Sequence, residues 1–165
     1  MTKLSDLKVK LFTDGAEKAQ ILEMAKQSWI AGFTTNPSLL KKASVSDYEA
    51  YGRDIVAAVP DRHISFEVFS DDIPEMVAQG RTIATWGKNV FVKLPVTNTR
   101  GEPLFDAVRS MSRDGIKINL TAIFTSDQIS RGVEALAGGA AGCVSVFAGR
   151  LGDVGIRSEE HTSEL

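Results

Sequence analysis

The stretch NVFVKLPVT, residues 89–97, places a lysine inside an otherwise apolar run. Such a run predicts a strand buried on both faces, where an ammonium group without a partner is costly. Desolvation disfavours the charged form of an amine, and a neutral amine can attack a ketone to form a Schiff base. Lys93 is therefore a candidate catalytic residue. The alternative is that its side chain extends from the strand end into solvent.

Polar residues also stand within or just after the other apolar runs. They are Asp14, Thr34, Asn36, Glu67, Asn119, Thr121, Ser145 and Arg150. Singly, most have a structural explanation, with Asp14 and Asn36 as turn residues and Arg150 as a solvated charge. Their recurrence at six consecutive strand ends is hard to explain by packing. Active sites of parallel α/β folds form at those ends.

These residue types suit the cleavage of a carbon–carbon bond through a Schiff base. An iminium on Lys93 would accept the electrons of the broken bond, and Asp14 is a candidate base for a hydroxyl proton. Glu67 and Thr121 can hold the water that forms and hydrolyses the iminium. An arginine such as Arg150 binds a phosphate through paired hydrogen bonds. The residues alone thus support the hypothesis of a Schiff-base aldolase.

The elements that must position these side chains alternate between short apolar runs and longer amphipathic stretches. We predict strands at residues 9–12, 31–38 (ending in a turn), 64–70, 90–96, 116–124 and 142–150. Helices are predicted at residues 16–30, 47–59, 71–86, 103–115 and 126–139. Ser126 and Asp127 are the expected caps of the last helix, and His63 is expected to be a surface residue in a turn. Six such periods predict a parallel α/β sheet.

Two architectures fit this pattern, the doubly wound sheet and the closed (β/α)8 barrel. The first strand is not followed by G-x-G-x-x-G and the sequence contains no P-loop motif, so the nucleotide-binding alternative loses its best support. A barrel needs eight periods and about 250 residues. The 165 residues supply six periods.

The composition is that of one globular domain, with 43% hydrophobic and 24% charged residues. A net charge of −2 lacks the basic excess of nucleic-acid-binding proteins, and no apolar run approaches the length of a membrane span. The single cysteine, Cys143, excludes an internal disulfide and favours a reducing, cytoplasmic location. His63 and His161 lie far apart in sequence with no cysteine beside them, so a zinc-type metal site is unsupported.

The motifs FTDGA, GFTTNPSLL, SFEVFS, VFVKLPVT, INLTAIFT and VSVFAGRLGD resemble those of the transaldolase family, from about residue 11 to residue 155. The resemblance implies a (β/α)8 barrel in which Lys93 forms the Schiff base and Asp14 is the acid/base at the C4 hydroxyl. It implies that Glu67 and Thr121 hold the catalytic water. The dihydroxyacetone moiety would contact Thr34, Asn36, Asn119 and Ser145, and the phosphate would contact Arg150. The resemblance implies no cofactor and no metal.

The expected reaction transfers a three-carbon dihydroxyacetone unit between sugar phosphates in the pentose phosphate pathway. Sedoheptulose 7-phosphate and glyceraldehyde 3-phosphate would give erythrose 4-phosphate and fructose 6-phosphate. The early first strand resembles the compact branch of the family, which includes fructose-6-phosphate aldolases, so simple aldol cleavage is an alternative. Glu67 favours transaldolase, because the aldolases carry glutamine there. Family members commonly form homo-oligomers.

Only six of the eight units that the resemblance implies are present. We expect residues 1–156 to form a partial, C-terminally truncated barrel domain. Residues 157–165, RSEEHTSEL, resemble translated adapter sequence and are expected to be a non-native tail. A partial barrel leaves its first and sixth strands as open edges, which invite aggregation or pairing. An inactive fragment is therefore the alternative to an enzyme.

Overall fold

The computed structural model describes residues 8–155, in which six strands alternate with helices. The strands are β1 (Leu11–Asp14), β2 (Ile30–Thr34), β3 (His63–Glu67), β4 (Val90–Pro95), β5 (Ile118–Ile123) and β6 (Gly142–Val146). The helices are α1 (Lys18–Ala25), α2 (Pro37–Lys42), α3 (Tyr48–Ala58), α4 (Ile73–Ala84), α5 (Phe105–Arg113), α6 (Ser126–Leu136) and α7 (Ala148–Asp153).

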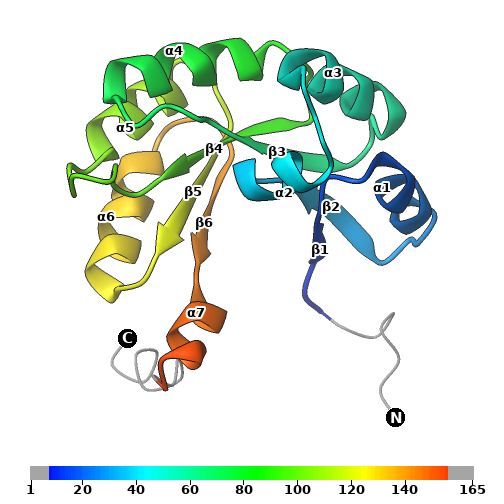
Figure 1. Ribbon diagram of the computed structural model, residues 1–165. Helices are drawn as coiled ribbons and strands as arrows, with labels where there is room; N and C mark the ends of the chain where they lie inside the picture. The colour runs from blue at the N-terminus through cyan, green and yellow to red at the C-terminus, as the bar shows by residue number, and fades with distance from the viewer. Residues whose placement is uncertain (1–7, 156–165) are drawn as a thin grey trace.

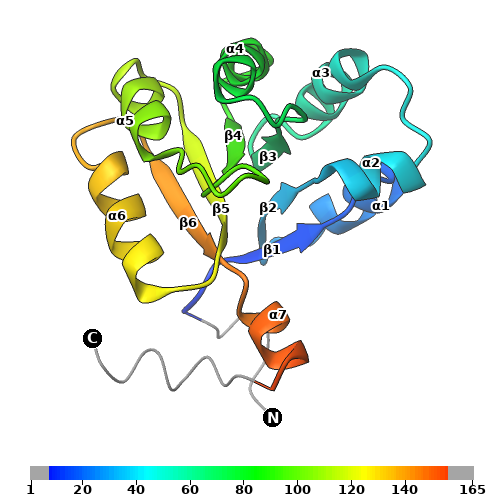
Figure 2. The ribbon, with the colours of Figure 1, turned by 60° about the vertical axis from the view of Figure 1, so that its left-hand side comes forward.

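The six strands are all parallel and pair in sequence order, from β1 to β6. Figures 1 and 2 show the sheet curling into an open arc, with α3, α4, α5 and α6 around its outer side. A doubly wound sheet would carry helices on both faces and reverse its strand order. The structure therefore confirms the barrel alternative, as a partial (β/α)8 barrel whose edge strands are β1 and β6.

The core lies between the outer face of the sheet and the helices. Outward residues of the central strands, such as Ile64, Phe66 and Val92, are fully buried and belong to one apolar cluster. Helix α4 approaches β4 closely at Gly80, where an added Cβ would lie 2.6 Å from Met111 Cε and 3.0 Å from Val92 Cγ1. This close helix–sheet packing holds β4, and with it the central part of the inner face, in a fixed position.

Short polar motifs set where the helices begin. Asp72 caps α4 by accepting a hydrogen bond from the backbone N–H of Glu75, and Pro74 occupies the first turn. The expected capping of α6 by Ser126 and Asp127 is wrong. Thr125 is the cap, because its Oγ1 accepts from Gln128 N while Gln128 Oε1 accepts from Thr125 N, a reciprocal capping box.

Two short helices follow strands where the sequence pattern predicts only strand or turn. Helix α2 begins directly after Asn36, whose Oδ1 accepts from Leu39 N at 3.0 Å, and Pro37 suits the first turn. The predicted sixth strand, residues 142–150, ends at Val146, and α7 occupies residues 148–153. The backbone bond from Leu151 N to Phe147 O closes the first turn of α7. Both helices lie at the carboxyl ends of strands.

Among residues 8–155, no helix is long and apolar enough to cross a membrane. The expected tail at residues 157–165 lies outside the described residues.

Candidate active site

A cavity of about 570 Å³ opens at the carboxyl ends of the strands. Eight of the nine site residues predicted from the sequence line it: Asp14, Thr34, Asn36, Lys93, Asn119, Thr121, Ser145 and Arg150. The ninth, Glu67, contacts Lys93 directly. A second cavity, of about 590 Å³, is lined by residues at the amino-terminal ends of β3 and β4, including His63 and Phe91. Because barrel active sites form at the carboxyl ends, the first cavity is the candidate active site.

Lys93 lies on β4 and is 7% exposed, so its side chain is buried on the inner face of the sheet. Its Nζ is 3.1 Å from Glu67 Oε2 and 3.3 Å from the backbone oxygen of Thr35. The amine is thus held by one carboxylate and one carbonyl, at the floor of an open cavity. The alternative that Lys93 extends into solvent is wrong, because β4 is a central strand of the sheet and its neighbours cover this side chain.

Glu67 ends β3 next to Lys93, since the two residues are register partners on neighbouring parallel strands. Burial raises the pKa of the Glu67 carboxyl, and the attraction of the Lys93 ammonium opposes this rise without cancelling it. The negative charge of Asp14 adds to the rise. A carboxyl with a raised pKa takes up and returns protons more readily near neutral pH. The Lys93–Glu67 pair is therefore suited to proton exchange.

Asp14 is held at the end of β1 by the neighbouring strand β2. Thr34 Oγ1 donates to Asp14 Oδ1 at 2.9 Å, and Asn36 Nδ2 donates to Asp14 Oδ2 at 3.4 Å. Asn36 also caps α2, so the same side chain begins this helix and lines the cavity. Each carboxylate oxygen of Asp14 thus has one fixed donor, and the remaining lone pairs can face the cavity.

Thr121 and Asn119 extend from β5 into the same cavity. Ser145 Oγ on β6 donates to Asn119 Oδ1 at 2.7 Å. Thr121 Oγ1 is buried and has no hydrogen-bond partner within residues 8–155. The following residue, Ala122, has a φ of 58°, and the β5–β6 register is irregular between Leu120 and Ile123. A strained residue at a bulge beside a cavity is typical of functional sites, where it redirects a side chain.

Arg150 reaches the cavity from α7, beyond the end of β6. Its guanidinium forms no ion pair with a carboxylate of the described residues, whereas Arg53, Arg81 and Arg109 each pair with one. A guanidinium without a carboxylate at the rim of a polar cavity can bind an anionic group of a ligand. Within residues 8–155, no group of three or more His, Cys, Asp or Glu side chains is arranged to hold a metal ion.

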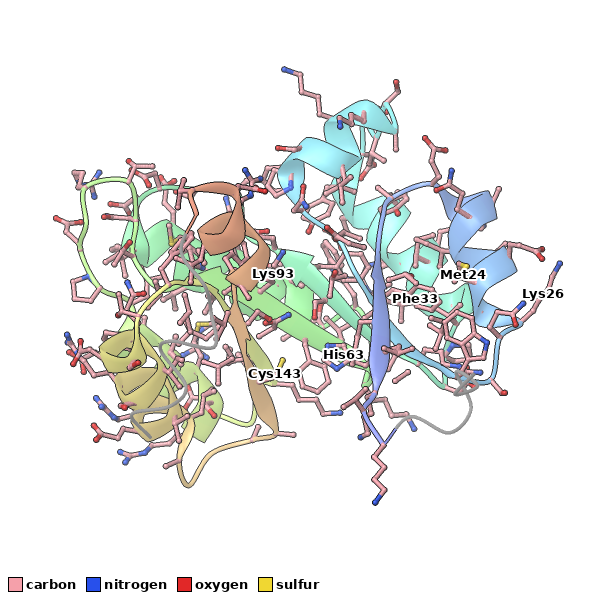
Figure 3. All side chains as sticks on the ribbon, turned by 90° about the horizontal axis from the view of Figure 1, so that it is seen from below. Met24, Lys26, Phe33, His63, Lys93 and Cys143 are labelled. Atoms are coloured by element: carbon pink, nitrogen blue, oxygen red, sulfur yellow. The ribbon has the colours of Figure 1, made fainter. Side chains whose placement is uncertain are left out.

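Sequence reasoning missed two contributors to the site. The carbonyl of Thr35 binds Lys93, and the hydroxyl of Ser65 binds Asn119. The expectation that His63 lies in a turn is wrong: β3 begins at His63, and its half-buried ring stacks on Phe91 at a centroid distance of 3.7 Å. Figure 3 shows Lys93 and His63 in the space between β1 and β6. The signal that could have found Ser65 is the two-residue period of a strand, which places His63, Ser65 and Glu67 on the same face of β3.

Known proteins with similar sequences identify the family to which the chain belongs. The family model described as Transaldolase/Fructose-6-phosphate aldolase matches residues 11–165. A probable transaldolase of Dehalococcoides mccartyi is 38% identical over 147 residues, which are 89% of this chain and 64% of that protein. A probable transaldolase of Roseiflexus castenholzii is 39% identical over 150 residues, 90% of this chain and 64% of the relative. One of Clostridium acetobutylicum is 41% identical over 152 residues, 91% of this chain and 65% of the relative.

The chain thus spans a little under two thirds of the length of these curated relatives. The match covers all six strands, and the strand ends that carry the candidate site lie within it. The chain belongs to the transaldolase/fructose-6-phosphate aldolase family.

Proposed function

We propose that this chain carries the catalytic residues of a class I, Schiff-base transaldolase. The observation that carries the proposal is the buried Lys93 amine beside the Glu67 carboxyl, with the Asp14 carboxylate lining the same cavity. The reaction would move a dihydroxyacetone unit from a ketose phosphate such as sedoheptulose 7-phosphate to glyceraldehyde 3-phosphate. A role in the pentose phosphate pathway, a cytoplasmic location and a homo-oligomeric state are part of the same proposal.

In the first step, the neutral Lys93 amine attacks the C2 carbonyl of the ketose. The resulting carbinolamine loses water to give an iminium. Glu67 would donate the proton that lets the carbinolamine hydroxyl leave as water, and the resulting carboxylate would later accept a proton from the water that hydrolyses the iminium. Water that enters and leaves in these steps needs polar partners, and the unpaired hydroxyl of Thr121 offers one.

In the second step, Asp14 takes the proton of the C4 hydroxyl and the C3–C4 bond breaks. The C4 fragment leaves as an aldehyde, and the electron pair of the broken bond moves into an enamine on Lys93. The enamine then attacks the acceptor aldehyde, and the same steps run in reverse. Arg150 would hold the phosphate of each sugar at the rim of the cavity, and Thr34, Asn36, Asn119 and Ser145 would contact the dihydroxyacetone end.

The second candidate is fructose-6-phosphate aldolase, in which the enamine is protonated and dihydroxyacetone is released. The family description names both activities. Glu67 supports transaldolase, in line with the glutamine expected in the aldolases. Release of free dihydroxyacetone without an acceptor would favour the aldolase, whereas consumption of fructose 6-phosphate only when an acceptor is added would favour transfer.

The test is reductive trapping. The full chain is incubated with fructose 6-phosphate and borohydride, and peptides are analysed by mass spectrometry. We expect a reduced three-carbon adduct on Lys93 and none in Lys93→Met. Lys117→Met is the matched control, since Lys117 lies immediately before β5 and its ammonium binds the backbone oxygen of Lys88 at the other cavity. An adduct on another lysine would refute the role of Lys93. No adduct at all would favour the inactive alternative.

A further inference from the structure

A chain of hydrogen bonds runs across the inner face of the sheet, linking β6, β5 and β3. Ser145 Oγ donates to Asn119 Oδ1 at 2.7 Å, and Asn119 Nδ2 donates to Ser65 Oγ at 3.1 Å. Ser65 Oγ lies 2.8 Å from His63 Nε2. The bond between Asn119 and Ser65 passes over β4, the strand that carries Lys93. The chain therefore connects His63, outside the candidate active site, to Asn119 inside it.

The direction of donation in this chain follows from the chemistry of its members. A hydroxyl has one proton to donate, and Ser65 already accepts from the Asn119 amide. Among the described residues, the only other side-chain partner of Ser65 Oγ is His63 Nε2. Ser65 is fully buried, so an undonated hydroxyl proton would be costly. Ser65 therefore donates to His63, and His63 Nε2 accepts.

The surroundings of His63 favour an acceptor. Its ring lies flat on Phe91, with an interplanar angle of 7°. The Phe12 ring packs against it in a T-shaped arrangement with a centroid distance of 4.9 Å. Burial lowers the pKa of His63 to about 4, and the positive charges of Lys117 and Lys10 contribute to this shift. The imidazole is thus neutral near pH 7, with one nitrogen free of a proton.

We propose that His63, acting through Ser65, is a positioning residue that fixes the orientation of the Asn119 amide toward the ketose. The inference rests on the proposed function, in which Asn119 contacts the dihydroxyacetone end of the substrate. Without an acceptor at His63, the Ser65 hydroxyl can donate to Asn119 Oδ1 instead. The Asn119 amide would then flip by 180°, which exchanges the positions of Oδ1 and Nδ2. The Asn119 amide would then populate two orientations, and only one of them could make the hydrogen bonds that the substrate needs.

The first test does not depend on activity. Long-range ¹H–¹⁵N spectra of the full chain report which nitrogen of each histidine carries the proton. The sequence contains two histidines, and His63→Phe assigns their signals. We expect His63 at pH 7 to be neutral with its proton on Nδ1, and the Nε2 signal to shift in Ser65→Ala. A proton on Nε2, or a charged His63 at pH 7, would overturn the proposal.

The second test measures how fructose 6-phosphate concentration affects reductive trapping on Lys93. We expect Ser65→Ala and His63→Phe each to raise the half-saturating concentration about tenfold, as the loss of one buried hydrogen bond does. The maximal rate should change less than about twofold. His63→Phe keeps an aromatic ring against Phe91, and His63→Gln, whose Oε1 can replace Nε2 as acceptor, should restore most of the binding.

The double variant separates positioning from general damage. If both residues act through one chain, Ser65→Ala combined with His63→Phe is no worse than either change alone, whereas independent effects multiply. The proposal would be refuted if the effects of the two changes on the half-saturating concentration multiplied in the double variant. It would also be refuted if the unaltered chain formed the Lys93 adduct and the single variants had the same half-saturating concentration as that chain. If the unaltered chain forms no adduct, the proposed function fails. The histidine spectra then still decide whether His63 accepts from Ser65.

Discussion

Glu67 Oε2 lies 3.1 Å from Lys93 Nζ because the two residues are register partners on neighbouring parallel strands. Partners in register on such strands project to the same face of the sheet. The pairing of β3 with β4 therefore delivers a carboxyl directly to the buried amine. The carboxyl keeps a raised pKa, and the pair can exchange a proton without rearrangement of the backbone.

Glu67→Gln should slow iminium formation, because the amide cannot donate the proton that the carbinolamine hydroxyl needs in order to leave. We expect the initial rate of borohydride trapping with fructose 6-phosphate to fall about 100-fold. Glu49→Gln changes an exposed ion pair with Arg53 on α3 and should leave the rate unaltered. An unchanged trapping rate in Glu67→Gln would remove Glu67 from the proposed mechanism.

Asp14→Asn should impair cleavage of the carbon–carbon bond more than formation of the iminium. The trapped adduct on Lys93 would then shift from three carbons toward the uncleaved six-carbon sugar phosphate, with cleavage slower by about 100-fold. Mass spectrometry of the Lys93 peptide distinguishes the two adducts. Asp54→Asn, which alters an exposed pair with Lys18, is the control. Equal losses in both steps would contradict the assigned role of Asp14.

Arg150→Leu should weaken the binding of phosphorylated sugars selectively. We expect the half-saturating concentration of fructose 6-phosphate to rise about 10- to 100-fold, in line with a lost charged hydrogen-bond pair. Trapping of unphosphorylated dihydroxyacetone should change little. Arg109→Leu, on the outer helix α5, is the control because that guanidinium pairs with Asp106. A similar loss for both substrates would mean that Arg150 supports the fold of α7 and not the phosphate.

His63 should make stability fall as the pH is lowered. Its pKa is about 4 in the folded protein against an ordinary value of 6.5. Between these values the unfolded chain binds a proton that the folded chain does not, so the free energy of unfolding decreases as pH drops from about 6.5 to about 4. A shift of this size corresponds to about 3.4 kcal/mol at full strength. Because the ring is only partly buried, solvent screens part of the effect, so we expect about 2 kcal/mol or less, and none in His63→Phe. Urea unfolding of both proteins across this window measures it, and parallel profiles would contradict it.

Gly80→Ala should destabilise the contact between α4 and β4. The new methyl group would meet Met111 Cε at 2.6 Å and Val92 Cγ1 at 3.0 Å. The flexible end of Met111 can move but the buried strand cannot, so we expect a loss of about 1–3 kcal/mol in thermal or urea unfolding. Gly149→Ala, where no atom outside the two neighbouring residues and the helix's own backbone lies within 4 Å of the added carbon, should change stability by less than about 0.5 kcal/mol. Equal effects would show that packing at Gly80 is loose.

Several features of the site follow from sequence patterns alone. The two-residue period of a strand places Asn119 and Thr121 on one face, and the apolar neighbours of Lys93 indicate its burial. The alternation of runs predicts a parallel sheet, and parallel strands bring their carboxyl ends to one edge. These features can be predicted because each depends either on the alternation of side chains along one strand or on the shared direction of parallel strands.

Other features depend on the tertiary structure. Curvature of the sheet gathers Asp14 of β1 and Ser145 of β6 around one cavity, and the register of β3 against β4 sets Glu67 beside Lys93. The link from His63 through Ser65 to Asn119 crosses a strand that lies between them. A local pattern states which face a side chain occupies. The distances between side chains on different strands depend on strand order, register and curvature, which arise from packing between residues far apart in the chain.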